Sequence, residues 1–179
     1  KKGNVLAVQI RRGEICTKNG DKSYREYYSI DNYIQNIDKL MDNNNYDYIY
    51  ISTDSEISEI EEIREKRPNW KLLYLPLERN NFFRMDDNAK STENGFYKAQ
   101  DLEDSCRLHP ESIPFIADSA LMDLYFISIC QGYISTISDS EFSRLGWYLQ
   151  IVEQQQITPY INLNTDKLDL NKRDNLLLL

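Results

Sequence analysis

The chain has 179 residues, of which 41% are hydrophobic, and its formal net charge at pH 7 is −8. That length suits one domain with a substantial core. The negative charge argues against a nucleic acid or an anionic membrane surface as partner, and no stretch is apolar for long enough to predict a membrane span.

The first half of the chain predicts three strands with two helices between them. Residues 5–10 are apolar at nearly every position, which is typical of a strand buried on both faces. Ser29 can cap a helix that runs to Met41 and turns one apolar stripe inward. The other expected elements are a strand over 46–52, a helix capped within 53–55 that ends at Pro68, and a strand over 70–75. The acids within 52–65 are interpreted as a solvated helix face.

The second half begins with residues 77–112, which show no periodicity and predict a functional loop or short elements. Four elements are expected after it: a helix over 116–130, a strand over 132–137, a helix from its cap Ser140 to about Glu153, and a strand over 158–163. We expect these side chains of the two helices to face the core: Leu121, Leu124, Tyr125, Ile127 and Ser128, then Phe142, Leu145, Leu149 and Val152.

This alternation predicts an α/β fold, a Rossmann-like, open and mostly parallel sheet with helices on both faces. We assign residues 1–165 to one such domain and 166–179 to a C-terminal tail. The closing leucines of that tail, 176–179, are expected to cover an apolar patch or to contact another domain. The G-x-G-x-x-G and P-loop patterns are missing from the sequence, so we expect no dinucleotide cofactor.

Cysteine and histidine usage indicates neither a disulfide framework nor a metal site. Cys16, Cys106 and Cys130 are isolated in the sequence, which favours a reducing compartment and a cytoplasmic location. His109 is the single histidine and has no cysteine at ligand spacing, so no bound metal is expected.

Two arginines and a glycine directly follow the first strand. The guanidinium groups of Arg11 and Arg12 are permanently charged and match phosphate oxygens bidentately. Parallel sheets bind ligands at this end of their strands, and Gly13 permits a sharp turn and the close approach of a ligand. The alternative is that one or both arginines only form surface ion pairs with the many acids of the chain.

Two acids occupy positions where a nucleotide could use them. Asp54 follows the second strand and can cap the next helix or accept hydrogen bonds from a ribose or base. Asp123 interrupts an apolar helix, where it lies at the solvent edge or is buried and paired. A guanine base would suit Asp123, because N1–H and the N2 amine present two donors to one carboxylate.

Hydroxyl groups precede the last predicted helix. Hydroxyls and backbone N–H groups at a helix N-terminus can form an anion cradle. The residues of this cradle would be Ser138, Ser140, Ser143 and Arg144. The alternative is that Ser140 is only a helix cap.

These segments together resemble the donor-binding half of the GT-B fucosyltransferases, specifically the α1,6-fucosyltransferases of the nodulation type and their animal counterparts. The matching stretches, in the family's order and with similar spacing over residues 4–152, are Gln9-Ile-Arg-Arg12, Tyr50-Ile-Ser-Thr-Asp54, Leu121-Met-Asp-Leu-Tyr125 and Ser140-Glu-Phe-Ser-Arg144. Arg11-Arg-Gly-Glu14 is also similar to a strand end of the α1,2-fucosyltransferases, so the linkage stays open.

The resemblance implies a metal-independent transferase of polysaccharide biosynthesis that moves fucose from GDP-fucose to a glycan hydroxyl with inversion. It implies that Arg11 contacts the β-phosphate, with Arg12 nearby, and that Asp123 binds the guanine base. Positive charge at Arg11 would stabilise the departing diphosphate. The remaining residues expected in this site are Gln9, Gly13, Asp54, Ser138, Ser140 and Arg144.

The chain departs from the family's pattern at Gln9, where the family has a histidine. Glutamine can form hydrogen bonds but cannot transfer a proton, and the only candidates for a general base are Glu14 and Asp21. GT-B enzymes place their site between two Rossmann-like halves, and the acceptor-side N-terminal half is expected to lie outside this chain. We therefore expect nucleotide binding with little transfer by the chain alone.

Two alternatives to a glycosyltransferase remain open from the sequence. One is a non-catalytic module of the same fold that binds a nucleotide or a glycan. The other is an unrelated α/β domain, such as a phosphate-ester enzyme, whose arginines match the family by chance.

Overall fold

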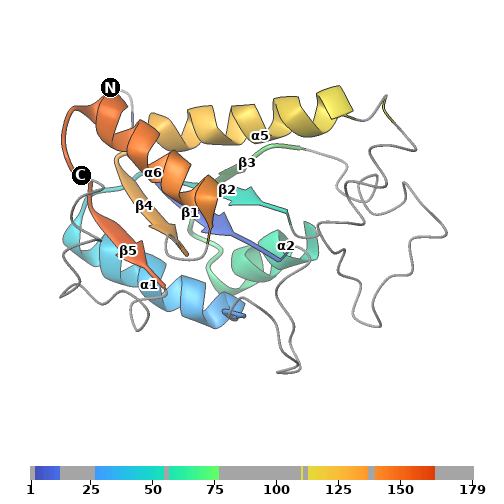
Figure 1. The fold of residues 1–179 in the computed structure, drawn as a ribbon. Coiled ribbons are helices and arrows are strands. Elements are labelled where there is room, and N and C mark those ends of the chain that lie inside the picture. The colour runs from blue at the N-terminus through green and yellow to red at the C-terminus, as the bar shows by residue number, and fades with distance from the viewer. Residues whose placement is uncertain are drawn as a thin grey trace.

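The computed structural model describes residues 3–12, 27–54, 57–76, 110, 113–136 and 140–163. The tail 166–179 and almost all of the segment 77–112 therefore lie outside the described residues. Strands and helices alternate along the rest of the chain (Figure 1). In chain order they are β1 (Val5–Ile10), α1 (Ile30–Asn43), β2 (Tyr48–Thr53), α2 (Ile57–Lys66), β3 (Leu72–Tyr74), α5 (Ile113–Ser128), β4 (Gly132–Ser135), α6 (Glu141–Gln154) and β5 (Tyr160–Asn162).

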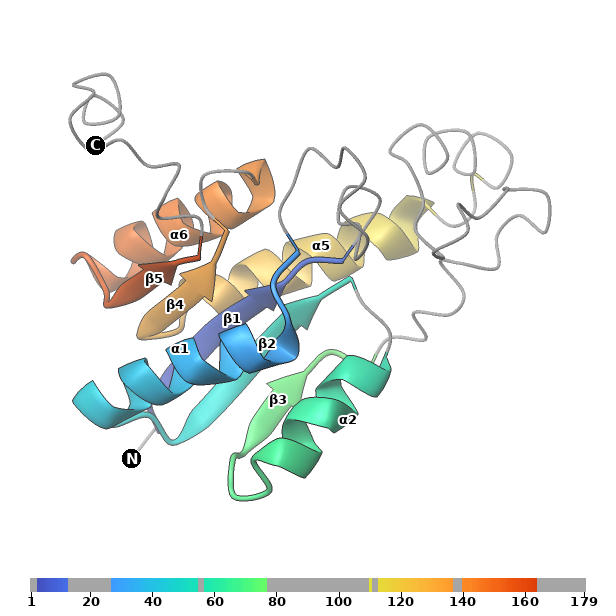
Figure 2. The same ribbon diagram turned by 90° about the horizontal axis from the view of Figure 1, so that it is seen from below.

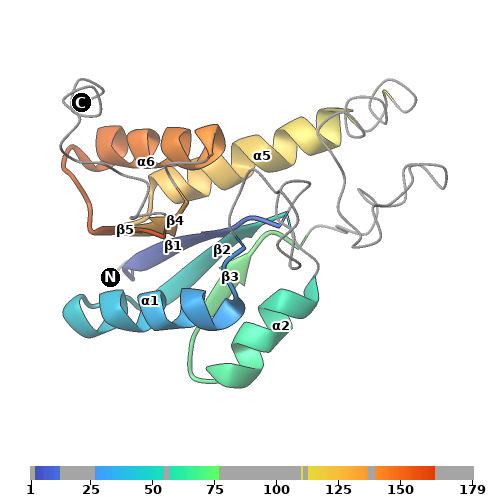
Figure 3. The ribbon, with the colours of Figure 1, turned by 60° about the horizontal axis from the view of Figure 1, so that its bottom comes forward.

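The strands form one parallel sheet of five strands in the order β3-β2-β1-β4-β5. Helices α1 and α2 cover one face of this sheet, and α5 and α6 cover the other (Figure 3). Figure 2 views the same arrangement from the side of α1 and α2. The predicted Rossmann-like α/β fold is thus confirmed, with every described strand pair parallel.

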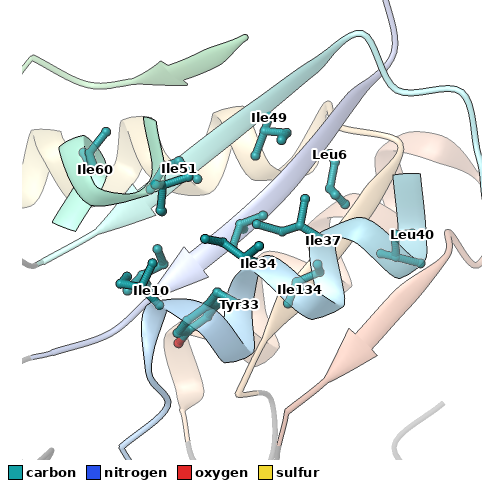
Figure 4. Packing of buried hydrophobic residues seen from close by; sticks show 13 residues of the cluster. Leu6, Ile10, Tyr33, Ile34, Ile37, Leu40, Ile49, Ile51, Ile60 and Ile134 are labelled. Carbon is teal, nitrogen blue, oxygen red and sulfur yellow. The ribbon is translucent and has the colours of Figure 1, made fainter. Parts of the chain in front are cut away.

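The central strand β1 is apolar throughout because both of its faces are covered. Leu6, Val8 and Ile10 belong to the larger hydrophobic cluster. Figure 4 shows Leu6 and Ile10 on the side of the sheet covered by α1 and α2. Ala7 points the other way, into a smaller cluster with Tyr50 and Ile127. This alternation follows from the two-residue period of a strand.

Helix α1 begins and packs as its sequence predicts. The Ser29 side chain accepts a hydrogen bond from the backbone N–H of Asn32, whose own side chain accepts one from the Ser29 backbone, so both halves of a capping box are present. The inward stripe of the helix is buried, as Figure 4 shows for its central part: Ile30, Tyr33, Ile34, Ile37 and Leu40.

The observed element bounds differ from the predicted ones by a few residues. The largest differences are in β3 and β5, which each cover three residues rather than the six of 70–75 and of 158–163, and in α5, which begins at Ile113 rather than at residue 116. Edge strands such as β3 end early because only one neighbouring strand supports their hydrogen bonds.

The predicted inward face of α5 is partly wrong. Leu124, Ile127 and Ser128 are buried as expected, but Leu121 and Tyr125 are 63% and 61% exposed. The helix is apolar nearly all round, so its hydrophobic pattern does not distinguish one face from another. The rotation of α5 instead places the carboxylate of Asp123 inward.

The predicted inward face of α6 is wrong for three of its four residues: Leu145, Leu149 and Val152 are exposed. The buried residues are Ser143, Gly146 and Gln150. Gln150 donates from Nε2 to the backbone carbonyls of Ile127 (3.1 Å) and Gly132 (3.2 Å). The fully buried part of the contact face is therefore one small residue and two polar ones, because it lies against backbone groups that need hydrogen bonds, and the half-buried Phe142 and Trp147 pack beside it.

Candidate nucleotide-binding edge of the sheet

Most of the predicted site residues that the structure describes lie at or next to the edge of the sheet where the parallel strands end. Strands β1 and β4 are neighbours in the middle of the sheet. After β1 the chain continues to α1 on one face, and after β4 it continues to α6 on the other face (Figure 3). The strand order therefore reverses between β1 and β4, and open α/β sheets bind ligands outside such a switch point.

Arg11 and Asp54 form an ion pair at this edge. The Nε atom of Arg11 lies 3.9 Å from Oδ2 of Asp54, and the two side chains are 27% and 40% exposed. Oδ1 of Asp54 accepts a 2.6 Å hydrogen bond from the backbone N–H of Arg12. Asp54 thus ties the end of β2 to the end of β1, while Arg11 keeps part of its side chain exposed at the edge.

Arg12 is buried, unlike its neighbour, and is only 4% exposed. Its Nε atom donates to both carboxylate oxygens of Glu59, at 2.7 and 2.8 Å. Its guanidinium carbon lies 4.5 Å from the ring centroid of Tyr27 and 5.6 Å from that of Tyr33. Burial alone would lower the pKa of Arg12, but the charge and hydrogen bond of Glu59 outweigh burial and the pKa is raised.

Gln9 is held by two hydroxyl groups on the side of α5 and α6. Its Oε1 accepts hydrogen bonds from the hydroxyl of Tyr133, at 3.1 Å, and from the hydroxyl of Ser143. Burial raises the pKa of Tyr133, so this phenol stays neutral and available as a donor. Because both hydroxyls bond Oε1, the amide Nε2 is directed elsewhere, and no atom of the described residues accepts a hydrogen bond from it.

The first turn of α6 lies next to Gln9. Ser140 is the N-cap of this helix, and its side chain accepts a hydrogen bond from the backbone N–H of Ser143, as predicted. Arg144 follows in the same turn, with its Nη1 atom 3.3 Å from the carboxylate of Glu141. The edge of the sheet between β1 and β4 therefore places Gln9 beside the capped N-terminus of α6. Arg11 and Arg12 follow β1 at this edge, and Arg144 lies in the first turn of α6.

Asp123 is buried on the side of the sheet covered by α5. Its Oδ1 accepts a hydrogen bond from the hydroxyl of Tyr50, which lies on β2. In the register of the sheet, Tyr50 pairs with Ala7, two residues before Gln9. Of the two predicted arrangements, buried and paired is thus the observed one, and the role of Asp123 with guanine stays a prediction.

Four of the predicted site residues lie outside the described residues: Gly13, Glu14, Asp21 and Ser138. The two candidate general bases are among them, so their position is not part of the described site.

Within the described ranges, no group of three or more His, Cys, Asp or Glu side chains could hold a metal ion. No helix in the described part of the chain combines the length and hydrophobicity needed to cross a bilayer.

Sequence reasoning missed Glu59, the partner of Arg12, because the acids of that region look like one solvated helix face. It also missed Tyr133, since a tyrosine within an apolar strand reads as a core residue. The available signal for Glu59 was its place in the first turn of α2, beside the strand end that carries the arginines.

Comparison with known protein families and with curated proteins gives no match for this chain.

Proposed function

We propose that this chain is the donor-binding domain of a glycosyltransferase that uses a guanine nucleotide sugar, with GDP-fucose as the expected donor. The observation that carries this proposal is the partly exposed side chain of Arg11 at the switch point. A second support is the resemblance of four segments to the GT-B fucosyltransferases. A fork of permanently charged donors suits the oxygens of a diphosphate.

Four groups of the site would act on the nucleotide. Arg11 would bind the β-phosphate, and the first turn of α6 would present backbone N–H groups and the positive end of its dipole to the same diphosphate. Nε2 of Gln9, which bonds to no atom of the described residues, would donate a neutral hydrogen bond to the diphosphate. Asp123 would accept hydrogen bonds from the guanine base, with Tyr50 fixing its carboxylate.

The proposed reaction is an inverting substitution at the anomeric carbon of the sugar. The acceptor hydroxyl oxygen forms a bond to that carbon while the bond from the carbon to the β-phosphate oxygen breaks, and the hydroxyl proton passes to a general base. Negative charge grows on the departing diphosphate, so Arg11 would stabilise the transition state more than the bound substrate. Glu14 and Asp21 remain the proposed candidates for the base, and no metal enters this proposal.

The alternative proposal is a non-catalytic nucleotide- or glycan-binding module of the same fold. Gln9 favours it, since a neutral amide cannot transfer a proton where the family has a histidine. A longer chain that contains an acceptor-side domain would separate the two proposals. Transfer or hydrolysis of GDP-fucose by that chain supports the enzyme, whereas binding of the donor without either reaction supports the module.

The direct test of the proposed ligand is calorimetric titration of this chain with GDP, UDP, GDP-fucose and GDP-mannose. We expect saturable binding of the guanine nucleotides and at least about tenfold weaker binding of UDP, which lacks the two donors proposed to meet Asp123. Equal binding of UDP and GDP would contradict a guanine site. Equal binding of inorganic phosphate would instead support a phosphate-ester enzyme.

A further inference from the structure

Arg11 and Arg12 are neighbours in the sequence, but the structure gives them different surroundings. The Arg11 side chain is 27% exposed beside Asp54, whereas the Arg12 side chain is 5% exposed beside Glu59. The terminal nitrogens of Arg12 are buried and have no hydrogen-bond partner in the described part of the chain. The faces of Tyr27 and Tyr33 lie against the guanidinium instead.

Arg12 connects several elements at the point where β1 ends. Its backbone N–H bonds to Asp54 at the end of β2, and its side chain bonds to Glu59 in the first turn of α2. Tyr27 precedes α1, and Tyr33 lies within it. One guanidinium group thus fixes the end of β1 relative to both helices of that face of the sheet.

We propose that Arg12 is a positioning residue, whose bonds to Glu59 and Asp54 hold the strand end so that Arg11 meets the donor's phosphates. This inference rests on the proposed function, because it is measured as nucleotide affinity. In this proposal Arg11 binds the phosphates of the donor, and Arg12 holds the end of β1 that carries Arg11.

Replacement of Glu59 distinguishes positioning from direct phosphate binding by Arg12. If Arg12 itself bound phosphate, Glu59 would compete with the ligand, and Glu59→Gln would leave GDP affinity unchanged or increase it. If Arg12 positions Arg11, Glu59→Gln loosens the strand end and lowers GDP affinity, although Glu59 contacts no nucleotide. Buried pairs are strongly coupled, so loss of one charge affects the placement of its partner.

The experiment is calorimetric titration of the whole chain with GDP, for the wild type and for Glu59→Gln. Glu62→Gln is the matched control, because Glu62 lies on the same helix, is 44% exposed and pairs with Lys66. We expect Glu59→Gln to lower GDP affinity by about three- to thirtyfold, and Glu62→Gln to leave it unchanged. Thermal unfolding shows that each variant is folded, and Glu59→Asp, which keeps the charge, replaces Glu59→Gln if that variant does not fold.

A second arm tests whether the effect passes through Arg11. Arg11→Lys keeps a positive charge but loses the bidentate fork. In that background we expect Glu59→Gln to lower GDP affinity by less than about twofold, because two changes that act through one contact are not additive. A purely structural role for Arg12 would give the same loss in both backgrounds.

The outcomes separate this inference from the proposed function. Wild-type binding with unchanged or stronger binding by folded Glu59→Gln overturns the positioning role alone. An equal effect of Glu59→Gln in the Arg11→Lys background also overturns it. Failure of the wild type to bind GDP overturns the proposed function and the inference with it.

Discussion

Near the end of β1, the face of the sheet to which a side chain points determines the groups that it contacts. Gln9 turns toward Tyr133 and Ser143 on the side of α5 and α6, and its Oε1 is fully occupied by their hydroxyls. Arg12 turns toward Tyr33 and Glu59 on the side of α1 and α2. The two-residue period of a strand produces this division before any ligand is present.

Gln9→Glu is expected to weaken GDP binding by at least about tenfold, because a carboxylate would replace the neutral amide beside the proposed diphosphate. Titration of GDP measures this loss. Gln156→Glu is the matched control, since it makes the same chemical change at an exposed position beyond the far end of α6. Equal GDP affinity for Gln9→Glu and the wild type would show that the amide does not face the nucleotide.

Cys130 is expected to be unreactive in the folded protein. The residue is 2% exposed, its Sγ donates to the carbonyl of Phe126, and burial raises the pKa of the thiol from 9.0 to about 12. Its contribution to stability is therefore complete below pH 9 and is lost as the pH rises from 9 toward 12. In a variant with Cys16→Ser and Cys106→Ser, thiol labelling at pH 8 should be slow in buffer and fast in urea, and fast labelling in buffer would contradict the burial.

At the scale of the elements, α6 shows why a hydrophobic pattern can indicate the wrong face. The residues that contact the rest of the domain include Gly146 and Gln150, whereas Val152 is 73% exposed. A side chain at Gly146 would place its Cβ 3.2 Å from a methyl group of Ile127, so the helix lies close to its neighbours. Close packing selected small and polar residues here, and hydrophobic periodicity does not detect that requirement.

Gln150→Ala is expected to lower the free energy of unfolding by about 1–3 kcal/mol, because the carbonyls of Ile127 and Gly132 and the hydroxyl of Thr158 would lose a partner. Val152→Ala is expected to change it by less than about 0.5 kcal/mol. Urea denaturation measures both values. A larger loss of unfolding free energy for Val152→Ala than for Gln150→Ala would support the inward face of α6 that the sequence predicts.

At the scale of the whole molecule, alternation of elements was enough to predict an open, mostly parallel sheet with helices on both faces, and the confirmed cap at Ser29 came from local sequence alone. The pairing of Arg12 with Glu59 could not be predicted, because 47 residues separate them and several acids of α2 would have been equivalent candidates. The inward turn of Asp123 depends likewise on Tyr50, a contact between residues 73 positions apart. Long-range side-chain pairs follow from the fold and not from the local pattern.

The most direct test of the nucleotide site is the GDP affinity of Arg11→Ala, measured by calorimetry against the wild type and against Arg64→Ala. Arg64 lies on α2, is 44% exposed and provides the matched loss of one surface charge. We expect saturable GDP binding by the wild type, a loss of about 2–4 kcal/mol of binding free energy in Arg11→Ala, and no change in Arg64→Ala. Equal GDP affinity for Arg11→Ala and the wild type, or no binding by either, would contradict a nucleotide site at this edge.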